Sequence, residues 1–168
     1  KFMTQIKLGD QVVNLSGKLP SVGSNAPDFC LANTDLVNTS LKDFKGKRIV
    51  LNIFPSLATP VCSASAHKFN ELASEMKNTI VICVSKDLAF SQKEFCSVNS
   101  LNNILFLSDM RNNNFGNDYG ILHSNGKFEG LLARSVIIIS DNGSVEYTQL
   151  VNQTGDEPNY DEVLNALT

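Results

Sequence analysis

The chain has 168 residues, of which 42% are hydrophobic and 18% charged, and its formal net charge is −3. This length suits one domain with a sizeable core, so we expect residues 1–168 to form a single domain. With this net negative charge, the protein lacks the positive field that attracts nucleic acids and anionic membranes. No apolar run approaches the roughly 20 residues that span a bilayer, and the first ten residues contain no signal-peptide core.

The cysteine content further limits the kinds of chemistry to expect. The four cysteines are Cys30, Cys62, Cys83 and Cys96. No Cys-x-x-Cys pair is present, so we expect neither a metal site nor a bound cofactor. Four thiols are also too few for a disulfide scaffold in a chain of this size. We therefore expect a cytoplasmic, reducing location and one or two chemically active cysteines.

The first half of the chain alternates strand and helix patterns. Two runs at 3–8 and 11–15 flank the turn Gly9-Asp10 and predict an N-terminal hairpin. A Gly/Ser/Pro link precedes a short strand at 29–31, in which we expect Cys30 to be packed. One helical turn is predicted at 40–44. An apolar strand over 49–54 and a helix from about 60 to 76 follow, because residues 69, 72, 73 and 76 form one apolar face.

The second half continues the alternation. The apolar run 80–84 lacks a polar face, which predicts a strand covered on both sides with Cys83 in the core. Asp87 is the predicted N-cap of a helix over 88–98, which carries Cys96 near its end. Further elements are predicted as a strand at 104–107, a helical turn and loop at 111–118, strands at 136–139 and 145–151 around Asn142-Gly143, and a helix at 160–167.

These elements together predict the fold class. Strands that alternate with helices, followed by an antiparallel hairpin, indicate a mixed central sheet flanked by helices. The architecture is α/β and thioredoxin-like, with the N-terminal hairpin as an extension.

The loop after the 49–54 strand is the candidate site. Thr59 suits an N-cap and Pro60 suits the first helical position, which makes Cys62 the third residue of the helix. The unpaired N–H groups and the positive end of the helix dipole favour a thiolate there. The Thr59 hydroxyl is near enough in sequence to bond to the sulfur or to cap the backbone. An inert buried cysteine is the alternative, but the loop favours a nucleophile.

The stretch from Pro55 to Cys62 carries the pattern Pro-x-x-x-Thr-x-x-Cys. It resembles the peroxiredoxins and, more narrowly, the bacterial thiol peroxidases, which are atypical two-cysteine peroxiredoxins. The resemblance covers nearly the whole chain and includes the segments 68–70, 94–96, 101–103, 118–120, 132–134 and 157–160. Two positions depart from the family, because Ala58 stands where an acidic residue is frequent and His67 where an arginine is common.

The resemblance implies roles for five residues. Cys62 would be the peroxidatic cysteine, with Thr59 bonding to the thiolate and the substrate oxygens, and Pro55 shaping and shielding the pocket. Arg134 would hold the thiolate and polarise the peroxide, which suits attack on an O–O bond. Cys96 would be the resolving cysteine.

The resemblance also implies a reaction and partners. Hydrogen peroxide or an organic hydroperoxide would oxidise Cys62 to a sulfenic acid, which would condense with Cys96 to an intramolecular disulfide. Thioredoxin would reduce that disulfide, and the protein would act as a homodimer in antioxidant defence.

Other interpretations remain open from the residues alone. Arg134 could pair with a surface carboxylate, and Cys96 could be a buried structural cysteine. A Cys/His hydrolase would need His67 or His123 beside Cys62. A redox sensor would use the same disulfide without turnover.

Overall fold

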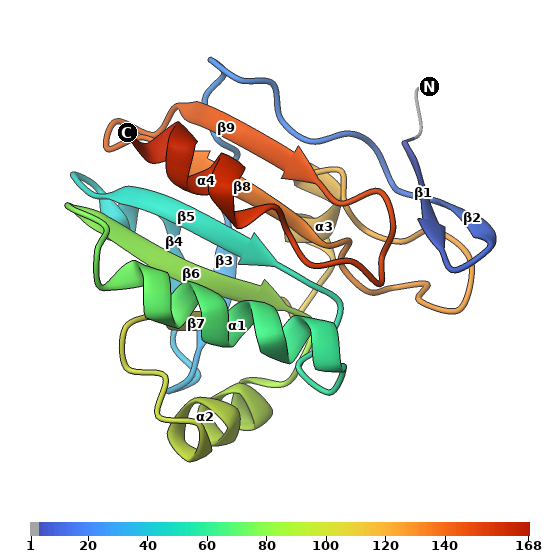
Figure 1. Cartoon of the computed structure of the whole chain (residues 1–168), viewed down its shortest axis with the longest axis horizontal. Coiled ribbons are helices and arrows are strands. Elements are labelled where there is room, and N and C mark those ends of the chain that lie inside the picture. The colour runs from blue at the N-terminus through green and yellow to red at the C-terminus, as the bar shows by residue number, and fades with distance from the viewer. Residues whose placement is uncertain (1–3) are drawn as a thin grey trace.

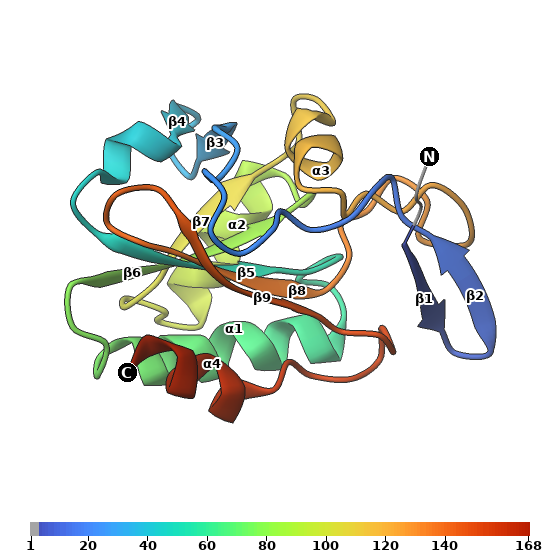
Figure 2. The same cartoon turned by 90° about the horizontal axis from the view of Figure 1, so that it is seen from above.

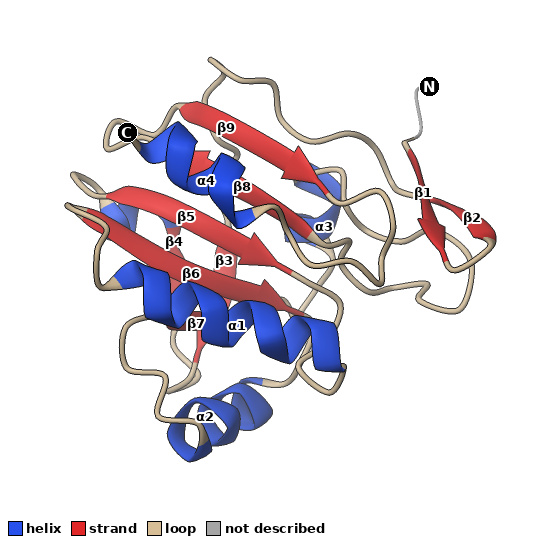
Figure 3. Cartoon of the chain, in the orientation of Figure 1, coloured by secondary structure: helices blue, strands red, loops and turns tan. Residues whose placement is uncertain are grey.

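The computed structural model describes residues 4–168, so Met3, where the first predicted strand begins, lies outside the described residues. Figures 1 and 3 show a sheet with helices packed against it and a separate hairpin at the N-terminal side. The elements are β1 (Gln5–Leu8), β2 (Gln11–Asn14), β3 (Cys30–Asn33), β4 (Asn38–Ser40), the 3-10 helix η1 (Leu41–Phe44), β5 (Arg48–Ile53), α1 (Pro60–Ala73), β6 (Thr79–Ser85), α2 (Ala89–Val98), β7 (Leu105–Ser108), α3 (Asn114–Asp118), β8 (Ser135–Ile139), β9 (Val145–Leu150) and α4 (Tyr160–Leu167).

The central sheet has the strand order β4-β3-β7-β6-β5-β8-β9. Strands β5, β6 and β7 are parallel, whereas β3, β8 and β9 pair antiparallel with their neighbours. In Figure 2 the sheet is seen nearly edge-on, with α1 and α4 side by side on one face and α3 on the other. The rings of Phe69 in α1 and Tyr160 in α4 meet edge to face at 5.4 Å. The predicted mixed, thioredoxin-like sheet with an N-terminal hairpin is therefore confirmed.

The core lies on both faces of this sheet. In β5, Ile49, Leu51 and Ile53 join the apolar cluster on one face. Val50 and the following Phe54 join the cluster on the face covered by α1 and α4. This two-sided burial explains why the central strands are apolar at almost every position.

Cys83 lies in the middle of β6 and is fully buried, as predicted. Burial raises the pKa of its thiol to about 12. The thiolate is the reactive form of cysteine, so Cys83 is held in its unreactive form.

Cys30 is exposed, so the expectation that it packs inside its strand is wrong. Successive side chains of a strand point to opposite faces. Leu31 fills the core position and is buried, whereas Cys30 lies on the opposite face at the exposed first position of the strand.

Two details of the predicted helices also differ. Helix α1 ends at Ala73 rather than near Met76, because the Ser74 hydroxyl donates to the Glu71 carbonyl and the chain turns there. Asp87 does not cap α2, whose N-cap is Leu88. The Asp87 carboxylate instead accepts hydrogen bonds from the loop that precedes α1.

Within residues 4–168, no helix combines the length and the hydrophobicity that crossing a bilayer requires.

The N-terminal hairpin packs over the loop that leads from α3 to β8. An isolated bridge joins Leu15, just after β2, to His123. The His123 side chain is 1% exposed and packs on Phe128, with ring centroids 6.0 Å apart. Neither ring nitrogen has a hydrogen-bond partner within residues 4–168. Burial lowers the pKa of this imidazole from its ordinary 6.5 to about 4.

This burial predicts a pH dependence of stability. The unfolded chain binds a proton at His123 at higher pH than the folded protein does, so stability falls as the pH drops from about 6.5 toward 4. The pKa of Asp109, which burial raises to about 6, acts in the opposite direction. His123→Phe leaves Asp109 in place, so its free energy of unfolding should decline less between pH 7 and pH 5 than that of the wild type. The same substitution at exposed His67 is the matched control, and equal declines in wild type and His123→Phe would contradict this role.

Candidate active site

Two neighbouring strands deliver the candidate site residues to one place. Helix α1 follows β5 after a short loop, and Cys62 is the third residue of the helix, as predicted. Strand β8 runs antiparallel to β5, and Ser135 pairs with Ile53 at the last position of β5. Arg134 immediately precedes Ser135, so the register sets it beside the loop that leads to Cys62.

Arg134 and Cys62 form the central contact of the site. The Arg134 Nη2 donates to the Cys62 Sγ at 3.4 Å. Cys62 has no exposed surface and Arg134 is 2% exposed. A guanidinium stays protonated in proteins, and a buried charge is costly without a partner of opposite sign. Within residues 4–168 no carboxylate lies within ion-pairing distance of Arg134, so the surface carboxylate partner considered from the sequence is not found.

A backbone carbonyl fixes the orientation of the guanidinium. The Thr154 carbonyl accepts from Arg134 Nε at 3.2 Å and from Nη2 at 3.1 Å. Thr154 is itself buried, and its hydroxyl and backbone N–H both donate to the Lys7 carbonyl of β1. The N-terminal hairpin is thereby joined through Thr154 to Arg134. The remaining nitrogen, Nη1, has no acceptor among the residues that the structure describes.

The loop between β5 and α1 positions the other two residues of the predicted pattern. Pro55 is buried two residues after the end of β5, and Thr59 is partly exposed at the N-cap of α1. The Thr59 hydroxyl donates to the Ser56 carbonyl at 3.0 Å. Its single hydroxyl proton thus goes to the Ser56 carbonyl rather than to the Cys62 sulfur, and the hydroxyl oxygen accepts no cap bond from the helix backbone, so neither of the bonds that we expected is present.

Cys96 lies in the last turn of α2 and is partly buried. Its Sγ donates to the Leu101 carbonyl at 3.1 Å, and desolvation raises the pKa of its thiol. All four cysteines are free thiols in this structure. The structure thus brings Arg134 to Cys62, whereas it holds Cys96 in a separate contact on the following helix.

Neither histidine bonds to Cys62. The His67 Nε2 is 3.2 Å from Asn99 Oδ1, and its ring meets Phe95 of α2 edge to face. His123 is buried beneath the hairpin, and its ring nitrogens have no partner within residues 4–168. The Cys/His hydrolase interpretation therefore lacks its base.

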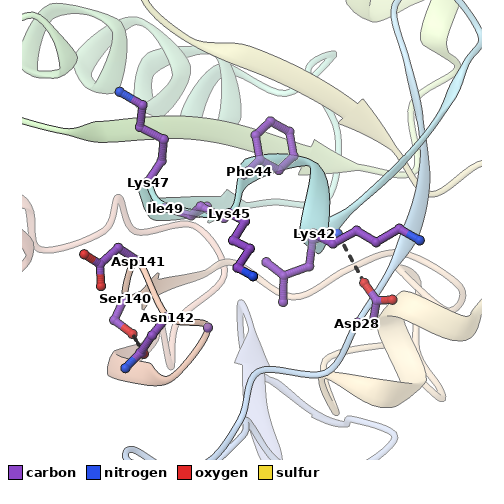
Figure 4. A pocket seen from close by; sticks show the side chains of 11 residues that line it. Asp28, Lys42, Phe44, Lys45, Lys47, Ile49, Ser140, Asp141 and Asn142 are labelled. Atoms are coloured by element: carbon purple, nitrogen blue, oxygen red, sulfur yellow. Dashed lines mark hydrogen bonds between the residues drawn. The ribbon is translucent and has the colours of Figure 1, made fainter.

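A pocket of about 240 Å³ lies away from these residues, at the start of β5 rather than its end. It is lined in part by Lys42, Lys45 and Lys47, together with Asp28 and Asp141. Figure 4 shows the three ammonium groups pointing in different directions. They do not converge on one anion, so we do not assign a site there.

Sequence reasoning missed the part played by Thr154. Thr154 acts on Arg134 through a carbonyl oxygen, which every residue possesses, so no side-chain pattern could have indicated it. The adjacent Gln153 pairs with the hairpin through a bridge to Lys7, a long-range contact that has no local signature.

The chain is similar to known proteins over most of its length. The family model described as Redoxin matches residues 21–164. The chain is 50% identical to a thiol peroxidase of Corynebacterium glutamicum over 152 residues, which cover 90% of this chain and 92% of that protein. It is 46% identical to a thiol peroxidase of Mycobacterium tuberculosis over 165 residues, covering 98% and 99% of the two chains.

Solved structures with the same fold include a peroxiredoxin-like protein from Aquifex aeolicus. That structure has a TM-score of 0.91 at 38% identity, and the match covers 99% of this chain and 98% of the other. A thiol peroxidase from Chromobacterium violaceum has a TM-score of 0.90 at 19% identity over 97% and 95% of the chains, which shows the shared fold alone. The protein therefore belongs to the redoxin family and, within it, to the thiol peroxidases.

Proposed function

We propose that this protein reduces hydrogen peroxide and organic hydroperoxides at Cys62 and forms a transient disulfide with Cys96. The observation that supports it best is the buried contact between Arg134 and the Cys62 sulfur. A thiolate at Cys62 would supply the counter-charge that the buried guanidinium otherwise lacks. Membership of the thiol peroxidases supports the same chemistry.

The first step is nucleophilic. The Cys62 thiolate attacks the terminal oxygen of the hydroperoxide, an S–O bond forms and the O–O bond breaks. The sulfur is oxidised to a sulfenic acid, and the leaving oxygen takes a proton to depart as an alcohol or water. Arg134 stabilises the developing negative charge, and its free Nη1 is a second donor for a peroxide oxygen.

Thr59 and Pro55 complete this step. The Thr59 hydroxyl can rotate from the Ser56 carbonyl to a peroxide oxygen, since a hydroxyl is both donor and acceptor and turns freely. Buried Pro55 helps to keep water from the sulfur, which strengthens electrostatic interactions at the site.

The second step joins the two cysteines. The Cys96 sulfur attacks the sulfenic sulfur, an S–S bond forms and water leaves. A disulfide requires Cα atoms within about 7 Å, and Cys96 is engaged with Leu101 on another helix. We therefore expect the first turn of α1 and the end of α2 to move so that the two sulfurs can meet. Thioredoxin then restores both thiols by dithiol exchange, donating two electrons and two protons.

We further propose that the enzyme serves antioxidant defence in the cytoplasm, where its four free thiols remain reduced. A homodimer is proposed from the family resemblance.

Substitution of each active cysteine separates the two steps. Cys62→Ser should abolish peroxide consumption, because the attacking sulfur is gone. Cys96→Ser should consume one equivalent of peroxide and then stop, because no disulfide is available to thioredoxin. Peroxide consumption is measured directly, and thioredoxin-linked recycling is measured as NADPH oxidation with thioredoxin and thioredoxin reductase. Cys83→Ser is the control, and normal cycling by Cys96→Ser would contradict the resolving role.

The role of Arg134 can be tested with one variant that removes its charge and one that keeps the charge but changes its shape. Arg134→Ala should slow the oxidation of Cys62 on the order of 100-fold, comparable to the loss of a donor in an oxyanion hole. Arg134→Lys should recover only part of this rate, because an ammonium cannot make the forked contacts to Cys62 and Thr154. Rates come from single-turnover mass analysis of acid-quenched samples. Wild-type oxidation rates in Arg134→Ala would remove the electrostatic role.

The link from the hairpin to Arg134 is testable at Thr154. Thr154→Val keeps the side-chain volume but loses the hydroxyl bond to the Lys7 carbonyl. We expect oxidation of Cys62 to slow roughly three- to tenfold, consistent with the net value of one hydrogen bond. Thr154→Ser should restore the rate. If Val and Ser variants react equally fast, the hydroxyl does not position the arginine.

A further inference from the structure

The carboxylate of Asp87 bonds directly to the loop that precedes Cys62. Its Oδ1 accepts from the Ser56 hydroxyl at 2.8 Å, and its Oδ2 accepts from the Leu57 backbone N–H at 2.8 Å. Hydrogen bonds to an ionised carboxylate are roughly twice as strong as neutral ones. Asp87 therefore holds two consecutive residues of a loop located about 30 positions earlier in the chain.

The same loop is organised around Ser56. The Ser56 carbonyl accepts from both the hydroxyl and the backbone N–H of Thr59. The Ser56 hydroxyl, which donates to Asp87, also accepts from the Ala58 N–H at 3.1 Å. The orientation of Thr59, the residue at the start of α1, thus depends through Ser56 on the Asp87 carboxylate.

Asp87 also belongs to the segment that begins α2. It lies two residues before Ala89, the first residue of that helix. Its Oδ2 accepts from the Ser85 hydroxyl at 2.6 Å, and the same hydroxyl accepts from the Gln92 amide of α2 at 3.2 Å. One carboxylate therefore ties the loop of Cys62 to the helix that carries Cys96.

A groove of about 380 Å³ lies between the two segments that Asp87 connects. Leu57, Ala58 and Asp87 line one part of it, and Glu94, Phe95 and Val98 of α2 line another. Packed side chains do not fill this space, so the loop has room to move toward α2 once its hydrogen bonds to Asp87 are released.

We propose that Asp87 is a positioning residue that holds the Ser56–Thr59 loop in its peroxide-reactive form and resists the movement that disulfide formation requires. The inference rests on the proposed function of Cys62 and Cys96. Asp87 touches neither sulfur and acts through Ser56 and Leu57. We call the hydrogen bonds from Asp87 to Ser56 and Leu57 the clamp. Loss of the clamp raises the population of the open loop, which has opposite consequences for the two chemical steps. Oxidation by peroxide needs the ordered loop, whereas condensation with Cys96 needs the released one.

Asp87→Asn tests this directly, because it conserves size while placing an amide N–H₂ among donors. Oxidation of Cys62 by hydrogen peroxide should slow on the order of tenfold, the scale of one hydrogen bond to a charged group. Condensation of the sulfenic acid with Cys96 should be as fast as in the wild type or faster. The chain has no tryptophan, so thiol, dimedone-trapped sulfenic acid and disulfide are quantified by mass in quenched-flow samples.

Two further variants make the result specific. Glu94→Gln removes the same charge from the same groove, and the Glu94 side chain forms no hydrogen bond or ion pair within residues 4–168. Both rates of this variant should equal those of the wild type. Ser56→Ala removes one of the clamp's bonds and should shift both rates in the same directions as Asp87→Asn but less. The double variant should match Asp87→Asn within about twofold, because interacting residues are not additive.

An unspecific loss of structure would slow both steps, so slower condensation in Asp87→Asn would overturn the inference. Unchanged oxidation would overturn it as well. A wild-type protein that forms no Cys62–Cys96 disulfide with peroxide would overturn the proposed function and this inference together. Wild-type disulfide formation with unaltered rates in Asp87→Asn would overturn the inference alone.

Discussion

The site depends on a buried guanidinium placed 3.4 Å from a buried cysteine sulfur. Arg134 has no carboxylate neighbour within residues 4–168, so in the proposed function a thiolate at Cys62 would supply its counter-charge. Removal from water strengthens this attraction and also raises the cost of leaving the guanidinium without a counter-charge. This one contact is the reason for proposing a fully covered cysteine, rather than an exposed one, as the reactive thiol.

The fold builds this contact from distant segments. The antiparallel register of β5 and β8 brings Arg134 to the end of β5. The helix that follows β5 sets Cys62 in its first turn, where unpaired N–H groups also favour negative charge. The hairpin contributes through Thr154, whose carbonyl holds the guanidinium. The N-terminal extension is thus connected to Arg134 as well as to the core.

Much of the architecture could be predicted because it follows local rules. The apolar runs of β5 and β6 are typical of strands covered on both faces, and Pro60 after Thr59 marks the start of α1. The exposure of Cys30 could not be predicted, because the side of a strand that faces the core depends on pairing partners that the sequence does not reveal.

The residues of the candidate site could be predicted only in part. Cys62, Thr59 and Pro55 fall in one short pattern, and Arg134 was assigned from the family resemblance. The Thr154 carbonyl and the partners of Asp87 were not foreseen. Asp87 precedes a helix and looks like an N-cap, but its acceptor oxygens are taken by a loop about 30 residues away. Such long-range polar contacts leave no periodic or local trace.

The most direct test of the account is to identify which sulfur is oxidised first. The reduced protein is treated with one equivalent of hydrogen peroxide, and its peptides are then mapped by mass. Accessibility alone favours Cys30, which is exposed, over Cys62, which is fully buried. The account predicts a single disulfide between Cys62 and Cys96, with Cys30 and Cys83 remaining thiols. Oxidation of Cys30 with Cys62 still reduced would contradict it.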